Sequence, residues 1–294
     1  MIRNGKGRGG IIDRFRPDDW QYLISNLREL LETGFDKSQK TIFLCGKSKD
    51  DSDGFRFKVS KILETEKNVD LAYPEDLFED LLEGQGKNSL QRLEESLASA
   101  VDLIVLIPES PGSFAELGAF SSDRLLANKM VVLRLNKFKS DKSFINHGPI
   151  RLVREHGGTI AEIPNDFDIT NLSHVEQVLQ PIRDKLKKRS KKKEFDNILL
   201  YSKYILIIIY LIEGVDFKDV CKMMEKIMHR PFKENDNIAC KAAIHSLIRN
   251  GSLYKQDDVY VITKVGYRNV IEMLYSRSLL NVLRVHVLNK QLSK

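Results

Sequence analysis

Residues 103–120 read LIVLIPESPGSFAELGAF, and this stretch decides the fold. It begins with five apolar residues, Leu103–Ile107, of the kind that is buried on both faces of a parallel sheet. A short turn containing proline and glycine follows, and helical spacing then runs over Phe114–Asn128. Because parallel strands are joined by crossover helices, this strand, turn and helix predict an α/β protein.

The same alternation of strands and helices extends over residues 20–182. We expect further strands at Thr41–Cys45, Val69–Tyr73, Met130–Leu135 and Thr159–Ile163, and further helices at Phe55–Thr65, Leu90–Ala100 and His174–Lys188. Right-handed crossovers then give a Rossmann/flavodoxin-like, doubly wound parallel sheet. Ligands of such sheets bind outside the carboxyl ends of the strands, so we expect the site at Gly46, at Tyr73 and after Pro108.

The pattern changes after Phe195. Helical segments are predicted at Ile198–Ile212, Phe217–Met228 and Asn237–Asn250, followed by a β-hairpin over residues 252–263 and a helix at Val265–Leu274. This order predicts a winged helix-turn-helix domain, whose third helix enters the major groove of DNA. The candidate contacts share one face of that helix, at i, i+4 and i+8: Lys241, His245 and Arg249. Equally, many winged helices bind only protein.

Positive charge is concentrated between the two predicted domains. The chain has a net charge of +6, and residues 183–193 read RDKLKKRSKKK, with eight basic residues against one acid. Basic runs commonly contact nucleic-acid phosphates, although a solvated helix end or linker has the same composition. The candidate contacts are Lys187, Lys188, Arg189, Lys191, Lys192 and Lys193. The expected organisation is a flexible basic arm (1–19), an α/β domain (20–182), a basic linker (183–196) and a winged-helix domain (197–294).

Composition excludes several classes of protein. The 294 residues are 42% hydrophobic and 30% charged, as in soluble globular proteins, and no apolar run is long enough to span a membrane. Three scattered cysteines, Cys45, Cys221 and Cys240, exclude a disulfide framework and a four-cysteine zinc site. The basic, glycine-rich start has no apolar core of a signal peptide. We therefore expect a cytoplasmic protein without a metal.

The turn after Leu103–Ile107 carries the chemistry. Gly112 would let a ligand approach the backbone closely, and Ser110 and Ser113 offer hydroxyl groups at a helix N-terminus, which suits a phosphate. Glu116 lies one turn into the helix. The alternative is structural, because Ser113 and Glu116 have the S-x-x-E spacing of a capping box.

Further acids and an aromatic residue are expected near the same sheet edge. Glu94 lies on the preceding helix, Asp102 directly precedes the central strand, and Tyr73, Glu75 and Asp76 follow the neighbouring strand. Each acid alone reads equally well as a surface residue or a helix cap. Their convergence on one edge favours a site.

Four segments of the chain resemble the effector of type II retrons: TIFLCG (41–46), YPEDLFEDLLEGQG (73–86), AVDLIVLIPESPGSFAELGAF (100–120) and KSFINHGPIRLVRE (142–155). That effector is similar to nucleoside 2-deoxyribosyltransferases, has a winged-helix tail, and is encoded beside a reverse transcriptase and its msDNA. The resemblance implies that Glu116 is the nucleophile at the anomeric carbon. It also implies that Glu94, where many members have Asp, assists the leaving base, and that Ser110 binds phosphate.

The resemblance further implies an N-glycosidase toxin whose substrate, rather than cofactor, is an NAD-like nucleotide. It would be restrained by the reverse transcriptase–msDNA complex, released during phage infection, and found as a homo-oligomer or in a higher assembly with that complex. Two carboxyl groups suit cleavage of a glycosidic bond, and nicotinamide leaves with little acid assistance because its cationic ring becomes neutral. The alternatives are a nucleotide-sensing DNA-binding adaptor without catalysis and a deoxyribosyltransferase of nucleotide salvage.

Overall fold

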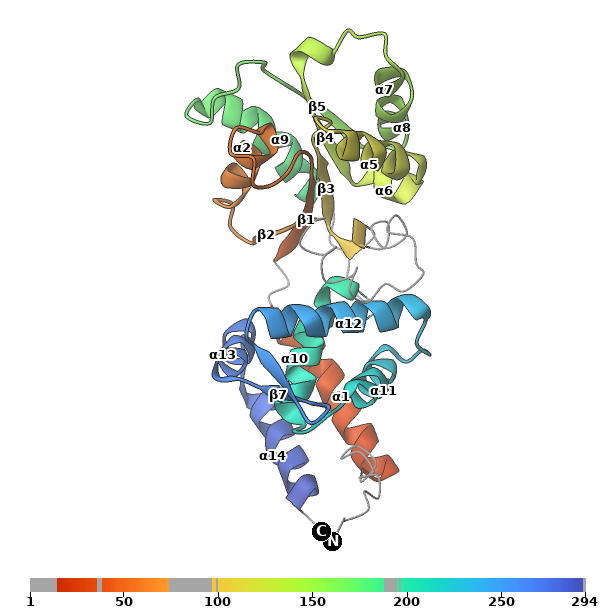
Figure 1. Ribbon diagram of the computed structural model, residues 1–294, viewed down its shortest axis with the longest axis vertical. Coiled ribbons are helices and arrows are strands. Elements are labelled where there is room, and N and C mark those ends of the chain that lie inside the picture. Colours follow the sequence, from red (N-terminus) through yellow and green to blue (C-terminus); the bar gives the residue numbers. More distant parts are fainter. Residues whose placement is uncertain are drawn as a thin grey trace. The chain divides into compact units, whose positions relative to one another are not determined.

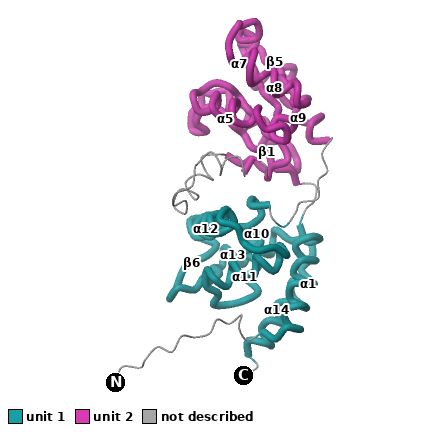
Figure 2. The backbone as a smooth tube through the Cα atoms, turned by 90° about the vertical axis from the view of Figure 1, so that its right-hand side faces the viewer, with its two compact units in different colours: residues 1–36, 80–86, 194–294 teal, residues 37–79, 87–193 magenta. Residues whose placement is uncertain are grey.

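The computed structural model describes residues 15–35, 39–73, 97–98, 100–187, 195 and 197–292. The chain forms two compact units (Figure 2). The first unit described below contains the described residues between 37 and 193 and is drawn in magenta, as unit 2, in Figure 2. The second contains those before residue 36 and after residue 194 and is drawn in teal, as unit 1. Within the described residues, no helix has both the length and the apolar character needed to cross a membrane.

The first unit is built on a five-stranded parallel sheet with the order β2-β1-β3-β4-β5. The strands are β1 (Lys40–Cys45), β2 (Val69–Ala72), β3 (Leu103–Leu106), β4 (Met130–Leu135) and β5 (Thr159–Ile163). Ile42 pairs with Leu103, so β3 lies beside β1 and the strand order reverses there. The predicted α/β fold is confirmed, and its switch point lies at the carboxyl ends of β1 and β3.

Helices cover both faces of this sheet (Figure 1). One face is covered by α2 (Phe55–Leu63) and α9 (Leu172–Lys187), and the other by α5 (Pro111–Ser122), α6 (Arg124–Asn128) and α8 (Pro149–Glu155). Alternate strand residues face the two layers, as the two-residue period of a strand requires. The strands read as continuous apolar runs because both faces are buried.

Two predicted helices differ from the structure. The expected helix Phe114–Asn128 is two helices, and it starts earlier, at Pro111. The break is at Asp123, whose backbone is extended and whose carboxylate accepts hydrogen bonds from the amides of Leu125 (2.7 Å) and Leu126 (3.0 Å). Asp123 therefore caps a second helix. The expected helix Leu90–Ala100 lies almost entirely outside the described residues.

The second unit contains helices and one hairpin, in the predicted chain order. The elements are α10 (Tyr201–Leu211), α11 (Phe217–Met228), α12 (Glu234–Arg249), the antiparallel strands β6 (Leu253–Gln256) and β7 (Val259–Ile262), and α13 (Lys264–Met273). A further helix that we did not predict, α14 (Ser278–Leu292), buries Leu280, Leu283 and Val287. The central helix α10 is almost completely buried, so it forms the core of the unit.

Helix α1 (Pro17–Thr33) packs in this second unit. Its buried stripe contains Leu23, Leu27 and Leu30 and joins the core around α10. The ammonium of Lys290 on α14 lies 2.8 Å from the Asp19 carboxylate. The sequence interpretation had placed residues 20–36 in the α/β domain. The structure instead places the described residues from 39 to 187, which form the α/β unit, between α1 and the rest of the helical unit in the chain.

Candidate active site

The candidate site lies where the β1–α2 and β3–α5 loops meet, at the carboxyl ends of β1 and β3. The hydroxyl of Ser110 donates to the carbonyl oxygen of Gly46 at 3.3 Å, which joins the two loops. A Cβ atom at position 46 would lie 3.0 Å from Arg56 Cδ and 3.1 Å from Glu109 Oε1. A side chain at position 46 would therefore crowd the side chains of Arg56 and Glu109.

The first turn of α5 is capped by a pair of serines. Ser110 is the N-cap, and its Oγ accepts a hydrogen bond from the Ser113 amide at 3.2 Å. In return, Ser113 Oγ accepts from the amides of Ser110 (2.9 Å) and Glu109 (3.0 Å) and donates to the Ser110 carbonyl (2.9 Å). Ser113 is only 1% exposed. The hydroxyl of Ser113 thus forms its hydrogen bonds with the backbone of the loop, and a contact of Ser113 with a substrate stays a prediction.

This arrangement removes the structural alternative for Glu116. The capping box uses Ser110 and Ser113, so the expected Ser113–Glu116 capping box is wrong. Side chains of a helix lean towards its N-terminus, which directs Glu116 over Gly112 and Ser113. Glu116 Oε2 is buried. The site therefore holds a carboxylate that does not cap the helix.

Gly112 leaves the start of α5 open. A Cβ atom at this position would have one neighbour within 4 Å, the Ser110 hydroxyl at 4.0 Å. Packing of the chain therefore does not demand a glycine here. Pro111 has no N–H group, and the exposed Gly112 amide makes no hydrogen bond within the described residues. A free amide at a helix N-terminus attracts anions, and the Ser110 hydroxyl beside it is partly exposed.

Glu109 is a residue of the site that the sequence analysis missed. Its Oε1 accepts hydrogen bonds from the amides of Lys47 (3.1 Å) and Arg56 (3.2 Å). Arg56 lies in the first turn of α2, where amides lack partners within the helix. Glu109 thus fixes the β1–α2 loop against the β3–α5 loop. An acid in a loop has no periodicity, so only the neighbouring Ser110 could have drawn attention to it.

Arg56 connects Tyr73 to the same site. The guanidinium is buried at 2% exposure, donates to the Lys47 carbonyl at 2.7 Å, and lies 5.2 Å from the centre of the Tyr73 ring. Burial raises the pKa of the Tyr73 phenol, so the ring remains neutral. The carboxyl edge of β1, β2 and β3 thus brings together Gly46, Tyr73, Ser110, Gly112, Ser113 and Glu116.

Asp102 does not join this group. It precedes β3, and its Oδ2 accepts a hydrogen bond from the Thr41 amide at 2.8 Å, at the start of β1. The amino ends of parallel strands form the opposite edge of the sheet, so Asp102 aligns β1 with β3 far from the site. We correct its expected role in substrate binding. Glu75, Asp76 and Glu94 lie outside the described residues.

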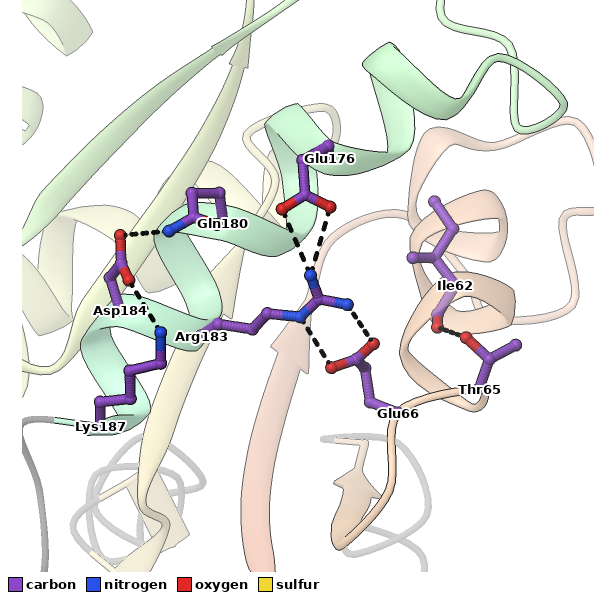
Figure 3. Close-up of polar contacts among 8 residues, drawn as sticks. All are labelled: Ile62, Thr65, Glu66, Glu176, Gln180, Arg183, Asp184 and Lys187. Carbon is purple, nitrogen blue, oxygen red and sulfur yellow. Dashed lines mark hydrogen bonds and ion pairs between the residues drawn. The ribbon is translucent and has the colours of Figure 1, made fainter.

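Part of the basic run has a structural role. Figure 3 shows the Arg183 guanidinium between the carboxylates of Glu66 and Glu176, with Nη2 2.7 Å from Glu66 Oε1 and Nη1 3.2 Å from Glu176. These contacts join α9 to the turn after α2. Lys187, the last residue of α9, is exposed and lies 3.5 Å from the Asp184 carboxylate. Lys188, Arg189, Lys191, Lys192 and Lys193 lie outside the described residues.

The predicted face of the third helix exists on α12. Lys241, His245 and Arg249 are all exposed, and their spacing places them along one side of the helix. The Lys241 ammonium lies 5.8 Å from the centre of the Phe217 ring. In the described part of the chain, no group of three His, Cys, Asp or Glu side chains is placed to hold a metal ion.

Comparisons with known proteins agree with this architecture. The family model described as "STM3845 retron effector protein" matches residues 53–262. The protein named "Retron Ec86 putative ribosyltransferase/DNA-binding protein", from Escherichia coli, is 34% identical over 293 residues, which cover 94% of this chain and 93% of that protein. "Retron Ec73 putative ribosyltransferase/DNA-binding protein", also from Escherichia coli, is 25% identical over 248 residues, covering 74% of this chain and 78% of that protein.

Proposed function

This chain belongs to the STM3845 retron effector protein family, and we propose that it is a defence toxin that hydrolyses the N-glycosidic bond of a nucleotide, with NAD as substrate. Membership of the family implies association with a retron. The names of the two relatives refer to ribosyl transfer and DNA binding. Hydrolysis and ribosyl transfer share the step at the anomeric carbon and differ in whether water or another molecule receives the sugar.

The observation that carries this proposal is the mutual capping of Ser110 and Ser113. It leaves Glu116 free of a capping role at the switch point of the sheet, one turn from an anion-binding amide and hydroxyl. A phosphate bound at the Gly112 amide and the Ser110 hydroxyl places the attached ribose over the first turn of α5. Glu116 leans towards the same turn.

In the proposed reaction, the Glu116 carboxylate forms a bond to the anomeric carbon of the ribose. The bond to the base breaks, and its electron pair goes to the ring nitrogen, so the cationic nicotinamide leaves as a neutral molecule. Water then attacks the anomeric carbon and loses a proton to the solvent, the bond to Glu116 breaks, and Glu116 is released as a carboxylate. Glu94 is proposed to assist the departure of bases that, unlike nicotinamide, leave as anions.

The second unit is proposed to be a winged helix-turn-helix domain that binds the retron's reverse transcriptase and msDNA. Its support is the order of α10, α11, α12, the β6–β7 hairpin and α13, together with the exposed Lys241, His245 and Arg249 on α12. We propose that the basic run around Lys187 adds contacts to phosphates. Binding to this complex would restrain the toxin until phage infection.

Incubation with NAD and a panel of nucleotides, followed by identification of the released base, tests the proposed reaction. We expect nicotinamide to be released by the wild-type protein and not by Glu116→Gln. A nucleotide that binds but is never cleaved by the wild-type protein would instead favour the nucleotide-sensing adaptor.

A further inference from the structure

The loop that follows β4 exposes aromatic and basic side chains together. It contains the short helices η2 (Asn136–Phe138) and α7 (Phe144–His147). We use the name loop surface for five residues: Lys137, Phe138, Lys139, Lys142 and Phe144. The two phenylalanines are 42% and 81% exposed, and the three lysines are exposed. Exposed apolar side chains mark an interaction surface when they are grouped rather than scattered, and here two of them occur in one short loop.

Side-chain hydrogen bonds tie the loop to the end of the sheet. The Asn146 side chain donates to the carbonyls of Phe138 and Asp141, both at 2.8 Å. Its own carbonyl accepts a hydrogen bond from Arg134 at 2.6 Å, and Arg134, only 3% exposed, also pairs with Glu162 of β5. The buried Arg134 thus anchors Asn146, which in turn binds two backbone carbonyls of the loop. The backbone that carries the exposed side chains is therefore already ordered, so little conformational entropy of the backbone is lost when a partner binds.

The charges of the loop surface are available to a partner. Among the described residues, no carboxylate lies within ion-pair distance of Lys137, Lys139 or Lys142. The Lys137 ammonium lies 4.9 Å from the centre of the Phe138 ring. Exposed aromatic rings interleaved with unpaired lysines are the combination that binds single strands, because bases stack on the rings and phosphates meet the ammonium groups.

We propose that the loop surface binds single-stranded DNA, supplied in a retron by the msDNA. This inference rests on the proposed function for its source of DNA, but not for the chemistry of the surface. Strand β4 pairs with β3, so the loop leaves the sheet beside the edge that carries Ser110 and Glu116. A DNA strand bound there would lie next to the entrance of the nucleotide site. DNA bound at this place would restrain the toxin by obstructing the entrance of the nucleotide site.

Titration of a fluorescein-labelled oligodeoxythymidine, followed by anisotropy at several salt concentrations, tests this inference. The full chain carries Lys241→Ser and Arg249→Ser as background, which reduces binding through α12. The basic run around Lys187 is the same in every variant, so differences between variants report on the loop surface. We expect Phe138→Ala with Phe144→Ala to weaken binding by about tenfold or more, since each stacked base is worth roughly 1–3 kcal/mol. Replacing the three lysines by Ser should lower the log–log salt slope by roughly 2, at about 0.7 for each lost phosphate contact.

The matched control is Leu125→Ala, which removes an apolar side chain of 76% exposure from α6 in the same unit. We expect this variant to bind the oligonucleotide like the background protein. Equal binding by the loop variants and the control would overturn the inference. Loss of base release with unchanged DNA binding would also overturn it, because the loop would then belong to the nucleotide site. If the wild type cleaves no nucleotide and the loop variants still lose DNA, the loop surface stands and the proposed reaction fails.

Discussion

Ser110 and Ser113 cap each other at the start of α5, each accepting a hydrogen bond from the other's amide. This pair explains why two serines flank the Pro-Gly turn without either being required for chemistry. It also separates roles that look alike in the sequence. The Ser113 hydroxyl is fully used by the backbone, whereas Ser110 lies partly exposed beside an open amide.

Glu116→Gln is expected to abolish base release while the protein remains folded. The substitution keeps the size of the side chain and removes the nucleophile, and no capping interaction is lost because Ser110 and Ser113 form the cap. Product analysis combined with a thermal melt checks this. Normal turnover by a well-folded variant would show that Glu116 is not the nucleophile.

Ser113→Ala and Ser110→Ala are expected to differ in kind. Ser113→Ala leaves two part-buried amides without their acceptor, which costs about 1 kcal/mol or more of unfolding free energy. Ser110→Ala removes an N-cap worth about 1 kcal/mol and raises KM for a nucleotide more than it lowers kcat. Denaturant unfolding and steady-state kinetics distinguish the two. A phosphate-free nucleoside that lost as much from Ser110→Ala as the nucleotide does would contradict the phosphate contact.

Gly112→Ala is expected to keep or increase stability but to impair nucleotide binding. The added Cβ meets only the Ser110 hydroxyl at 4.0 Å, and alanine is better than glycine in a helix by about 0.5–1 kcal/mol. A methyl group at this place would nevertheless keep a phosphate from the backbone. The melting temperature and the nucleotide affinity are the two readings. Undiminished affinity would mean that no ligand approaches Gly112.

Glu66→Gln is expected to make unfolding less sensitive to acid. The hydrogen bonds from Arg183 hold the pKa of Glu66 below its usual value of 4.5, despite partial burial. The stability from this ion pair is therefore complete above that value and is lost as the pH falls through the lower folded-state pKa. Denaturant melts of wild type and variant between about pH 7 and about pH 3 should converge at the acid end.

Glu64→Gln is the control for this experiment. Glu64 forms an exposed ion pair with Lys61 at the end of α2, next to the turn that carries Glu66. Exposed pairs contribute little, so its melts should follow the wild type at every pH. Parallel curves for wild type and Glu66→Gln would contradict the assigned role of Arg183.

Asp258→Gly is expected to raise the melting temperature by a few degrees. Gln256 pairs with Val259, so Asp257 and Asp258 form a two-residue hairpin turn, with φ angles of 48° and 69°. Such turns favour Asn-Gly because residues with side chains are strained at positive φ. Asp258→Asn, which tolerates this conformation and also removes the ion pair with Lys255, should melt like the wild type. If both variants lose stability equally, the ion pair outweighs the strain.

The strands could be predicted from the sequence because burial on both faces leaves continuous apolar runs such as LIVL in β3. The start of α5 could not be placed from S-x-x-E spacing, because Ser110 with Pro111 fits the N-cap and first helical positions better. Asp102 precedes β3 in the sequence, so its place at the amino edge, opposite the site, could have been predicted from the direction of the strand.

The features that could not be predicted from the sequence depend on contacts between residues far apart in the chain. Glu109 acts through amides 62 and 53 residues away, which no local pattern reveals. The amphipathic stripe of α1 predicts a helix with one buried face, but not that its partners lie beyond residue 194.

The place of α1 has a consequence for biosynthesis. The ribosome synthesises α1 before the α/β domain, whereas the side chains that cover Leu23, Leu27 and Leu30 belong to segments translated after that domain, from α10 to α14. Domains generally fold as they emerge from the ribosome. The α/β domain can therefore fold while the apolar face of α1 is still exposed to solvent. An incomplete product therefore carries an exposed apolar helix, the kind of segment that chaperones and proteases recognise. The helical unit can thus form only after α10 to α14 have been translated.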